Sequence, residues 1–121
     1  MLIGRGQASR SFEVDQRAGN DVAVNQNTIQ PAGFTGWHSH PGITVIAVQS
    51  GQVRLFSGRI TGGRCRARTY PAGQVFLEHP KNEYDAVNIG TEPAVSAITF
   101  FNVPHGGSSR IDQIDPGNCP G

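Results

Sequence analysis

Turn signals containing glycine and proline divide the sequence into short apolar or β-branched segments, and this spacing restricts the fold more than any other feature. The turn signals are Pro31-Ala32-Gly33, Ser50-Gly51, Thr61-Gly62-Gly63, Pro71-Ala72-Gly73 and Asn88-Ile89-Gly90. The segments between them are Ser11–Val14, Val22–Ile29, Ile43–Val48, Val53–Phe56, Cys65–Tyr70, Gln74–Glu78, Tyr84–Asn88 and Ala94–Val103. Such a series of short strands is typical of all-β sandwiches and barrels. It predicts an all-β jelly roll with little or no helix, in which two sheets enclose a small interior.

Length and composition exclude most other architectures. The chain has 121 residues, including 16 Gly and 8 Pro, and only 16% of it is charged. A single lysine, Lys81, and this low charge argue against a helical bundle and against a charge-rich disordered chain. We expect one domain over residues 1–121, with a core at about 11–103. The apolar density falls after Pro104, which predicts an irregular C-terminal tail over 104–121, anchored by Ile111 and Ile114.

The charge balance gives no support for a nucleic-acid or membrane partner. Ten Lys and Arg against nine Asp and Glu give a net charge of +1. No apolar run approaches the roughly 18–20 residues of a membrane span. The nearest approach to a basic patch is Arg64, Arg66 and Arg68, whose spacing places them on one face of a strand. They form either a solvated sheet edge, where charged side chains are common, or an anion-binding patch.

The two cysteines, Cys65 and Cys119, do not form a C-x-x-C motif. A bridge between them would close a loop of about 55 residues, which the loop-entropy model credits with on the order of 4 kcal/mol. The alternative is two reduced cysteines that never meet. The N-terminus, Met1–Arg5, has no apolar signal-peptide region. We therefore expect a cytoplasmic protein, or a secreted mature form if the disulfide is present.

The segment Gly36-Trp37-His38-Ser39-His40-Pro41-Gly42 carries the clearest chemical signal. In an extended chain, residues i and i+2 point to the same side, so the imidazoles of His38 and His40 can bind one metal ion. Imidazole is a good ligand for zinc, iron, copper and nickel. The alternative is two surface histidines near a turn, because a His-x-His pair alone is a weak signal.

The spacing around this pair resembles the two motifs of the cupin superfamily. The first is approximately G-x5-H-x-H-x3,4-E-x6-G, in which His38, His40 and Gly51 match. The second is approximately G-x5-P-x-G-x2-H-x3-N, whose two ends match Gly73 and Asn88. The segments W-H-S-H-P-G, Y-P-A-G-x-x-F-x-E and D-P-G-N-C-P resemble a group of small single-domain bacterial cupins, mostly of unassigned function. The resemblance implies a jelly-roll barrel with a site in its mouth.

Two of the four customary cupin ligands are missing. Thr44 occupies the position of the motif's glutamate, and Tyr84 that of its second-motif histidine. Tyr84 is a candidate ligand because a phenolate coordinates ferric iron; a hydrogen-bonded core tyrosine is the alternative. Glu78 is a candidate replacement carboxylate, and a solvent-facing residue at a strand end is its alternative. If Glu78 faces the site, its neighbour His79 points to the opposite side of the strand.

These residues favour a metal-dependent cupin enzyme that acts on a small molecule in the barrel mouth. The predicted ligands are His38, His40, Tyr84 and Glu78, for a divalent iron, zinc, manganese, copper or nickel ion; Tyr84 and Glu78 are also candidate catalytic residues. The resemblance implies oxygenase, isomerase, lyase or cyclase chemistry without choosing among them. The alternatives are a non-catalytic cupin that has lost its metal and binds a small molecule or sugar, and a structural oligomerising module. The resemblance also implies a homodimer.

Overall fold

The computed structural model of the protein describes residues 1–59 and 63–119. Its strands are β1 (Gln7–Ala8), β2 (Asp21–Ile29), β3 (His38–Ser39), β4 (Thr44–Ser50), β5 (Gln52–Arg59), β6 (Arg66–Pro71), β7 (Gln74–Glu78), β8 (Asn82–Val87), β9 (Ala94–Val103) and β10 (Ile111–Asp112). The described residues contain no helix, so none of them forms a helix that could span a membrane. The all-β prediction is confirmed.

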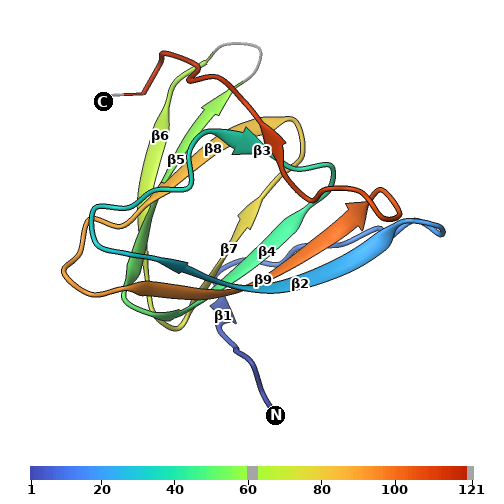
Figure 1. Cartoon of the computed structure of the whole chain (residues 1–121), viewed down its shortest axis with the longest axis horizontal. Helices are drawn as coiled ribbons and strands as arrows, with labels where there is room; N and C mark the ends of the chain where they lie inside the picture. The colour runs from blue at the N-terminus through green and yellow to red at the C-terminus, as the bar shows by residue number, and fades with distance from the viewer. Residues whose placement is uncertain (60–62, 120–121) are drawn as a thin grey trace.

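The strands form two five-stranded sheets that face one another in a jelly roll (Figure 1). The strand order is β1-β7-β4-β9-β2 in the first sheet and β10-β3-β8-β5-β6 in the second. The pairings are antiparallel, apart from the parallel pair of β1 and β7. Because the chain crosses repeatedly between the sheets, strands distant in sequence, such as β3 and β10, become neighbours.

The hydrophobic core fills the space between the sheets. The alternation of side chains along β4 places Thr44, Ile46 and Val48 in the interior and leaves the residues between them half-buried. The buried core residues are Ile29, Ile46, Val48, Val53, Leu55, Phe76, Tyr84, Ala86 and Ala94. Polar side chains also face this interior, among them Thr44 itself at 1% exposure. Buried polar groups need partners, and the functional site is built where they find them.

The strand predictions hold for the long segments and are wrong at the N-terminus. The predicted segments locate β2 and β4 to β9, and Gln74–Glu78 and Ala94–Val103 match their strands end to end. Ser11–Val14 is not a strand; the N-terminal segment contributes β1 instead. β3 and β10 have two residues each, too few for periodicity to reveal. The turn predicted at Thr61-Gly62-Gly63 lies largely outside the described residues.

Polar contacts hold the C-terminal tail against the second sheet. Ile111 is 46% exposed and Ile114 is 87% exposed, so the prediction that these residues anchor the tail is wrong. Instead, β10 pairs with β3, and the Gln113 backbone N–H donates to the Trp37 carbonyl at 3.1 Å. The tail therefore runs beside the strand that carries the first histidine of the predicted pair.

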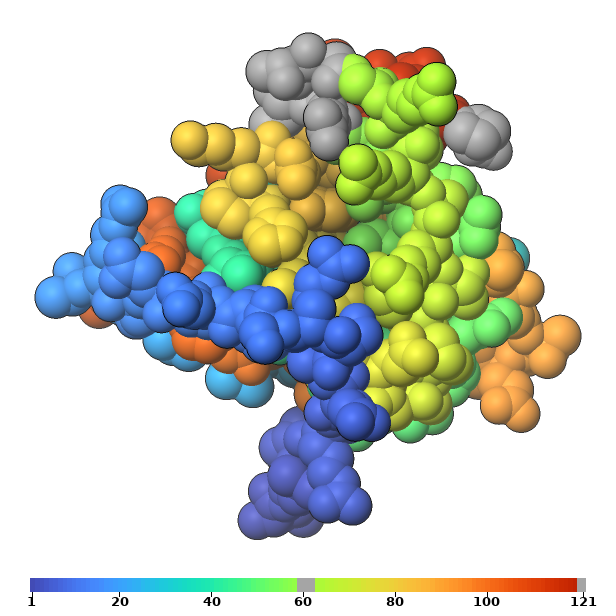
Figure 2. All heavy atoms as spheres, turned by 180° about the vertical axis from the view of Figure 1, so that it is seen from behind, coloured from blue at the N-terminus to red at the C-terminus, as the bar shows by residue number. Residues whose placement is uncertain are grey.

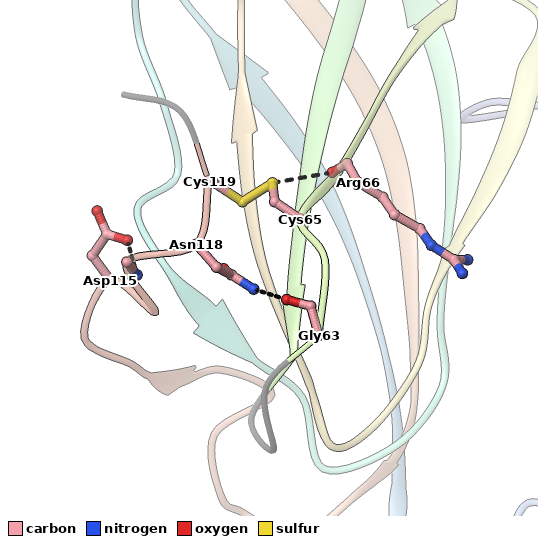
Figure 3. The surroundings of a disulfide bond; sticks show 7 residues. Gly63, Cys65, Arg66, Asp115, Asn118 and Cys119 are labelled. Atoms are coloured by element: carbon pink, nitrogen blue, oxygen red, sulfur yellow. Dashed lines mark hydrogen bonds between the residues drawn. A yellow bond between two sulfur atoms is a disulfide. The ribbon is translucent and has the colours of Figure 1, made fainter.

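A disulfide between Cys65 and Cys119 fixes the far end of the tail (Figure 3). Close to it, the Asn118 side-chain amide donates to the Gly63 carbonyl at 2.8 Å. Of the two alternatives that the sequence leaves open, the bridged one is confirmed. The compartment stays a prediction.

Candidate metal centre

Three side chains with metal-binding atoms meet inside the jelly roll. His38 lies on β3, His40 follows it before β4, and Glu78 ends β7. Glu78 Oε1 lies 2.6 Å from His40 Nε2 and 3.3 Å from His38 Nε2. The candidate ligand atoms of all three lie within 4.8 Å of one another. The exposed fractions of His38, His40 and Glu78 are only 5%, 6% and 4%, so the cluster belongs to the interior.

Two backbone carbonyls hold the imidazole rings in place. His38 Nδ1 lies 2.8 Å from the Gly36 oxygen, and His40 Nδ1 lies 2.7 Å from the Ser109 oxygen. Because a carbonyl oxygen can only accept, each Nδ1 carries a proton and donates it. The Nε2 atoms are therefore the ones that face Glu78. Carbonyl partners of this kind are common for metal-ligating histidines, because they fix the tautomer and the ring orientation.

Hydrogen bonds join the two histidines to Glu78, and the pKa values of His38 and Glu78 are shifted as a result. Burial by itself lowers the pKa of His38, but the hydrogen bond and the negative charge of Glu78 outweigh burial, so this pKa is raised. Burial acts to raise the pKa of Glu78, and the hydrogen bonds from both histidines outweigh it, so this pKa is lowered. The cluster thus favours a carboxylate beside an imidazolium. A metal cation bound to Nε2 would replace the imidazolium proton.

The sheet register explains how Glu78 can replace the carboxylate missing from the cupin motif. Thr44 on β4, at the motif's glutamate position, pairs directly with Glu78 on β7. Directly opposed residues of an antiparallel pair place their side chains on the same face, with Cβ atoms about 5 Å apart. A carboxylate on β7 therefore reaches the same point as one on β4. His79, the next residue, is exposed, as the alternation predicts.

Tyr84 lies opposite His38 in the pairing of β3 and β8, yet its hydroxyl is engaged elsewhere. The hydroxyl oxygen accepts the His79 backbone N–H at 2.8 Å and the Asn82 side-chain amide at 3.3 Å. Burial raises the pKa of Tyr84, which keeps the phenol neutral. Tyr84 lines a different hollow from the one beside the histidines. Its role as a ligand or catalytic residue stays a prediction.

The cluster lines a hollow of about 250 Å³. Most of its wall is apolar and includes Ile29, Ile46 and Phe100. Arg110 and Asn25 also line it and are exposed, so they mark its mouth. Neither Arg110 nor the Ser109 carbonyl is predicted from the sequence. A backbone carbonyl leaves no signal in a sequence, and the tail carries no motif that would have placed it here.

The three side chains fit a divalent first-row metal ion. Two imidazole nitrogens and one carboxylate oxygen suit iron, zinc and manganese, and two histidines with one carboxylate on one side of an ion form a known catalytic arrangement. Ligand atoms bound to one such ion lie within roughly 4 Å of one another, because each bond is about 2.0–2.2 Å long. The separations between the candidate ligand atoms of the cluster, at most 4.8 Å, are close to this value.

Metal affinity is expected to fall as the pH is lowered, beginning at a higher pH than for an ordinary histidine site. The metal competes with the proton on Nε2 of His38, and the pKa of His38 is raised above its usual 6.5. Below that pKa, the affinity should fall about tenfold per pH unit for each displaced proton. Titration with Zn²⁺ against a chelator across about pH 5.5–8 measures this. An affinity that does not change with pH would contradict it, and the exposed His105→Gln variant should give the wild-type profile.

Comparison with known proteins identifies the fold. No protein-family model and no curated protein sequence matches the chain. Solved structures do match, and an oxalate decarboxylase from Lactobacillus farciminis in a formate complex superposes with a TM-score of 0.65 at 22% identity, over 77% of this chain and 27% of that one. An oxalate oxidase in complex with the substrate analogue glycolate superposes with a TM-score of 0.60 at 24% identity, over 69% of this chain and 42% of that one. The Bacillus subtilis oxalate decarboxylase, which has Mn(II) centres, superposes with a TM-score of 0.63 at 22% identity, over 84% of this chain and 30% of that one.

The chain spans less than half the length of these proteins, and identities this low establish a shared fold only. The neighbours agree with the two-sheet topology and with the motif spacing found in the sequence. The protein therefore has the cupin fold, the jelly roll that it shares with oxalate decarboxylase and oxalate oxidase.

Proposed function

We propose that the protein is a metal-dependent cupin enzyme that acts on a small molecule in the hollow beside His38, His40 and Glu78. One observation carries the proposal: three buried, pre-oriented ligand atoms converge in the wall of a hollow that opens to solvent. Three protein ligands leave coordination positions for water and substrate, as catalytic metal sites do, whereas structural sites are closed by a fourth ligand.

Three ligands rather than four are favoured by the contacts of Tyr84. Its oxygen already accepts two hydrogen bonds, from His79 and Asn82, outside the cluster. Glu78, in contrast, lies within hydrogen-bonding distance of both histidines. We therefore propose that Glu78 is the third metal ligand rather than a catalytic acid or base.

A small carboxylic acid is the substrate class that we propose. The structural neighbours are described with oxalate, formate and glycolate, and one of them has Mn(II) centres, so manganese and oxalate are the first candidates. Arg110 at the mouth supports an anionic substrate: its Nε donates to Asp112 at 2.7 Å, and its terminal nitrogens can still donate to a substrate carboxylate. A bound metal would polarise a substrate oxygen. The apolar side chains of the wall would shield part of a bound substrate from water.

Metal loading combined with turnover tests the proposal. Chelated protein is supplied separately with Mn²⁺, Fe²⁺, Co²⁺, Ni²⁺, Cu²⁺ or Zn²⁺, and bound metal is determined by elemental analysis. Small carboxylates, oxalate first, are then assayed for carbon dioxide, formate and hydrogen peroxide. We expect one ion per chain and product formation that a chelator abolishes. A chain that binds none of these metals contradicts the proposal and favours the non-catalytic alternative. The single domain and the homodimer stay predictions.

A further inference from the structure

A second hollow, of about 310 Å³, lies where β1 and β6 form the edges of the two sheets. The metal hollow lies toward the opposite edges, formed by β2 and β10, and among residues 1–59 and 63–119 only Phe76 lines both hollows. In Figure 2, the N-terminal segment (blue) lies beside the yellow-green residues of β6, and both contribute lining residues to this hollow. The proposed function makes no use of this hollow.

The register of β6 directs two arginines into it. Arg66 and Arg68 alternate with outward-facing residues and so share a face with Tyr70. Tyr70 stacks on Phe76 in the core, with ring centroids 4.4 Å apart, which identifies this face as the inner one. The residue opposite Arg68 on β5 is the buried Leu55. Arginines therefore occupy positions at which a core-facing strand ordinarily carries apolar side chains.

The positive charge of this hollow has no acidic counterpart. Arg10 and Arg64 join Arg66 and Arg68 in the lining, and none of the described residues that line it is Asp or Glu. In the part of the chain that the structure describes, none of the four forms a salt bridge. They are four of the ten basic residues of a chain with a net charge of only +1. Clustered cations of one sign focus a positive potential that a bound anion would neutralise.

The remaining lining suits an organic group attached to that anion. Tyr70 and Phe12 supply aromatic surface, and the Arg68 guanidinium lies 5.4 Å from the centre of the Tyr70 ring. The volume is within the range of small-molecule sites, about 300–1,000 Å³. The planar fork of arginine matches the oxygens of a phosphate group. We propose that this hollow binds a small phosphate monoester, with its phosphate between Arg66 and Arg68 and its organic part against Tyr70.

Edge protection explains only part of this arrangement. Inward-pointing charged residues on an edge strand prevent unwanted pairing with another chain, and β6 is an edge strand. Arg10 and Arg64, however, lie outside every strand and still line the same hollow. Arginines from two separate segments line the same hollow, which favours ligand binding over protection of a sheet edge as their role.

Calorimetric titration of the full chain with phenyl phosphate at low salt tests the proposal. The variant R66A/R68A removes two of the guanidinium groups. R54A is its matched control, because Arg54 lies on the adjacent strand, donates to Thr69 Oγ1 at 3.0 Å, and does not line the hollow. We expect wild-type affinity in R54A and at least about tenfold weaker binding in R66A/R68A, since each hydrogen bond to a charged group is lost. Inorganic phosphate should bind more weakly than phenyl phosphate, and phenol should not bind.

Three results would overturn the proposal. The first is no binding of phenyl phosphate to the wild-type chain, which leaves the arginines as edge protection. The second is an equal loss of affinity in R54A and R66A/R68A, which indicates non-specific charge attraction. The third is binding only to phosphatidylcholine vesicles that contain phosphatidic acid, which indicates a lipid headgroup. Circular dichroism checks that R66A/R68A is folded. If it is not, the exposed Arg10→Ala replaces it, with a smaller weakening expected because Arg10 lines the hollow outside the pair that holds the phosphate; wild-type affinity in this variant would then contradict the proposal.

Discussion

Replacing Glu78 with glutamine is expected to weaken divalent-metal binding by more than about 100-fold, because even residues that only orient a ligand are worth about 10–100-fold. Glutamine preserves the size of this buried side chain and removes the negative charge that balances the ion. The His38→Ala variant should lose affinity to a similar extent. The measurement is competition for Mn²⁺ and Zn²⁺ between the protein and a chromogenic chelator.

His79→Gln is the matched control for Glu78→Gln. The two residues are adjacent in the chain, but His79 is exposed and lies outside the ligand cluster. Its variant should bind metal with wild-type affinity. If Glu78→Gln also retains wild-type affinity, Glu78 is not a ligand, and Tyr84 becomes the remaining candidate for a third one.

The Glu78→Gln variant has a second measurable effect, on the pKa of His38, that does not depend on metal. In the wild-type chain, burial lowers the pKa of His38, and Glu78 reverses the effect through its hydrogen bond and charge. Without the carboxylate, burial acts with little opposition, so the pKa of His38 should fall from above its usual value to below it. Titration of the imidazole resonances by NMR measures this change in the metal-free protein. A His38 pKa that stays raised would show that the pairing with Glu78 does not control it.

The sequence predicts the fold well because its strands are long and regularly interrupted. Gln74–Glu78 and Ala94–Val103 match their strands to the residue, since both alternate and both are bounded by turn residues. The strands that the sequence does not predict share one cause: β1, β3 and β10 have two residues each and exist only through their tertiary pairing. Periodicity needs a longer window than two residues. The anchors of the tail are wrong for a different reason: hydrogen bonds and a disulfide hold it, whereas Ile111 and Ile114 are exposed.

The sequence predicts side chains of the candidate site but not the pairing and backbone contacts that position them. Spacing and resemblance predict His38, His40, Glu78 and Tyr84, and the structure brings the first three together. The hydroxyl of Tyr84 accepts hydrogen bonds from His79 and Asn82 instead. Pairing partners are set by register, so the sequence could not show that Thr44 and Glu78 lie opposite one another. Nor could it show that the Ser109 carbonyl orients His40, because a backbone atom has no residue type.

Removal of the disulfide in the Cys65→Ser/Cys119→Ser double variant is expected to lower the free energy of unfolding by about 4 kcal/mol, because the bridge joins residues 54 apart in sequence and restricts the unfolded chain. Urea unfolding measures this loss. Reductant should destabilise the wild type and leave the double variant unchanged, which controls for the substitutions themselves. Equal unfolding midpoints for wild type and variant, without reductant, would contradict the prediction.

The same variant should weaken metal binding, although Cys65 and Cys119 lie outside the ligand cluster. The tail that the bridge tethers carries the Ser109 carbonyl, which accepts the Nδ1 proton of His40 at 2.7 Å. With the bridge removed, the tail is held by the short pairing of β10 with β3, the contacts of Gln113 and the hydrogen bond from Asn118 to the Gly63 carbonyl. Loss of an orienting partner costs about tenfold or more in affinity, so the effect should be smaller than that of Glu78→Gln. Unchanged affinity in the folded variant would show that β10 alone holds Ser109 in place.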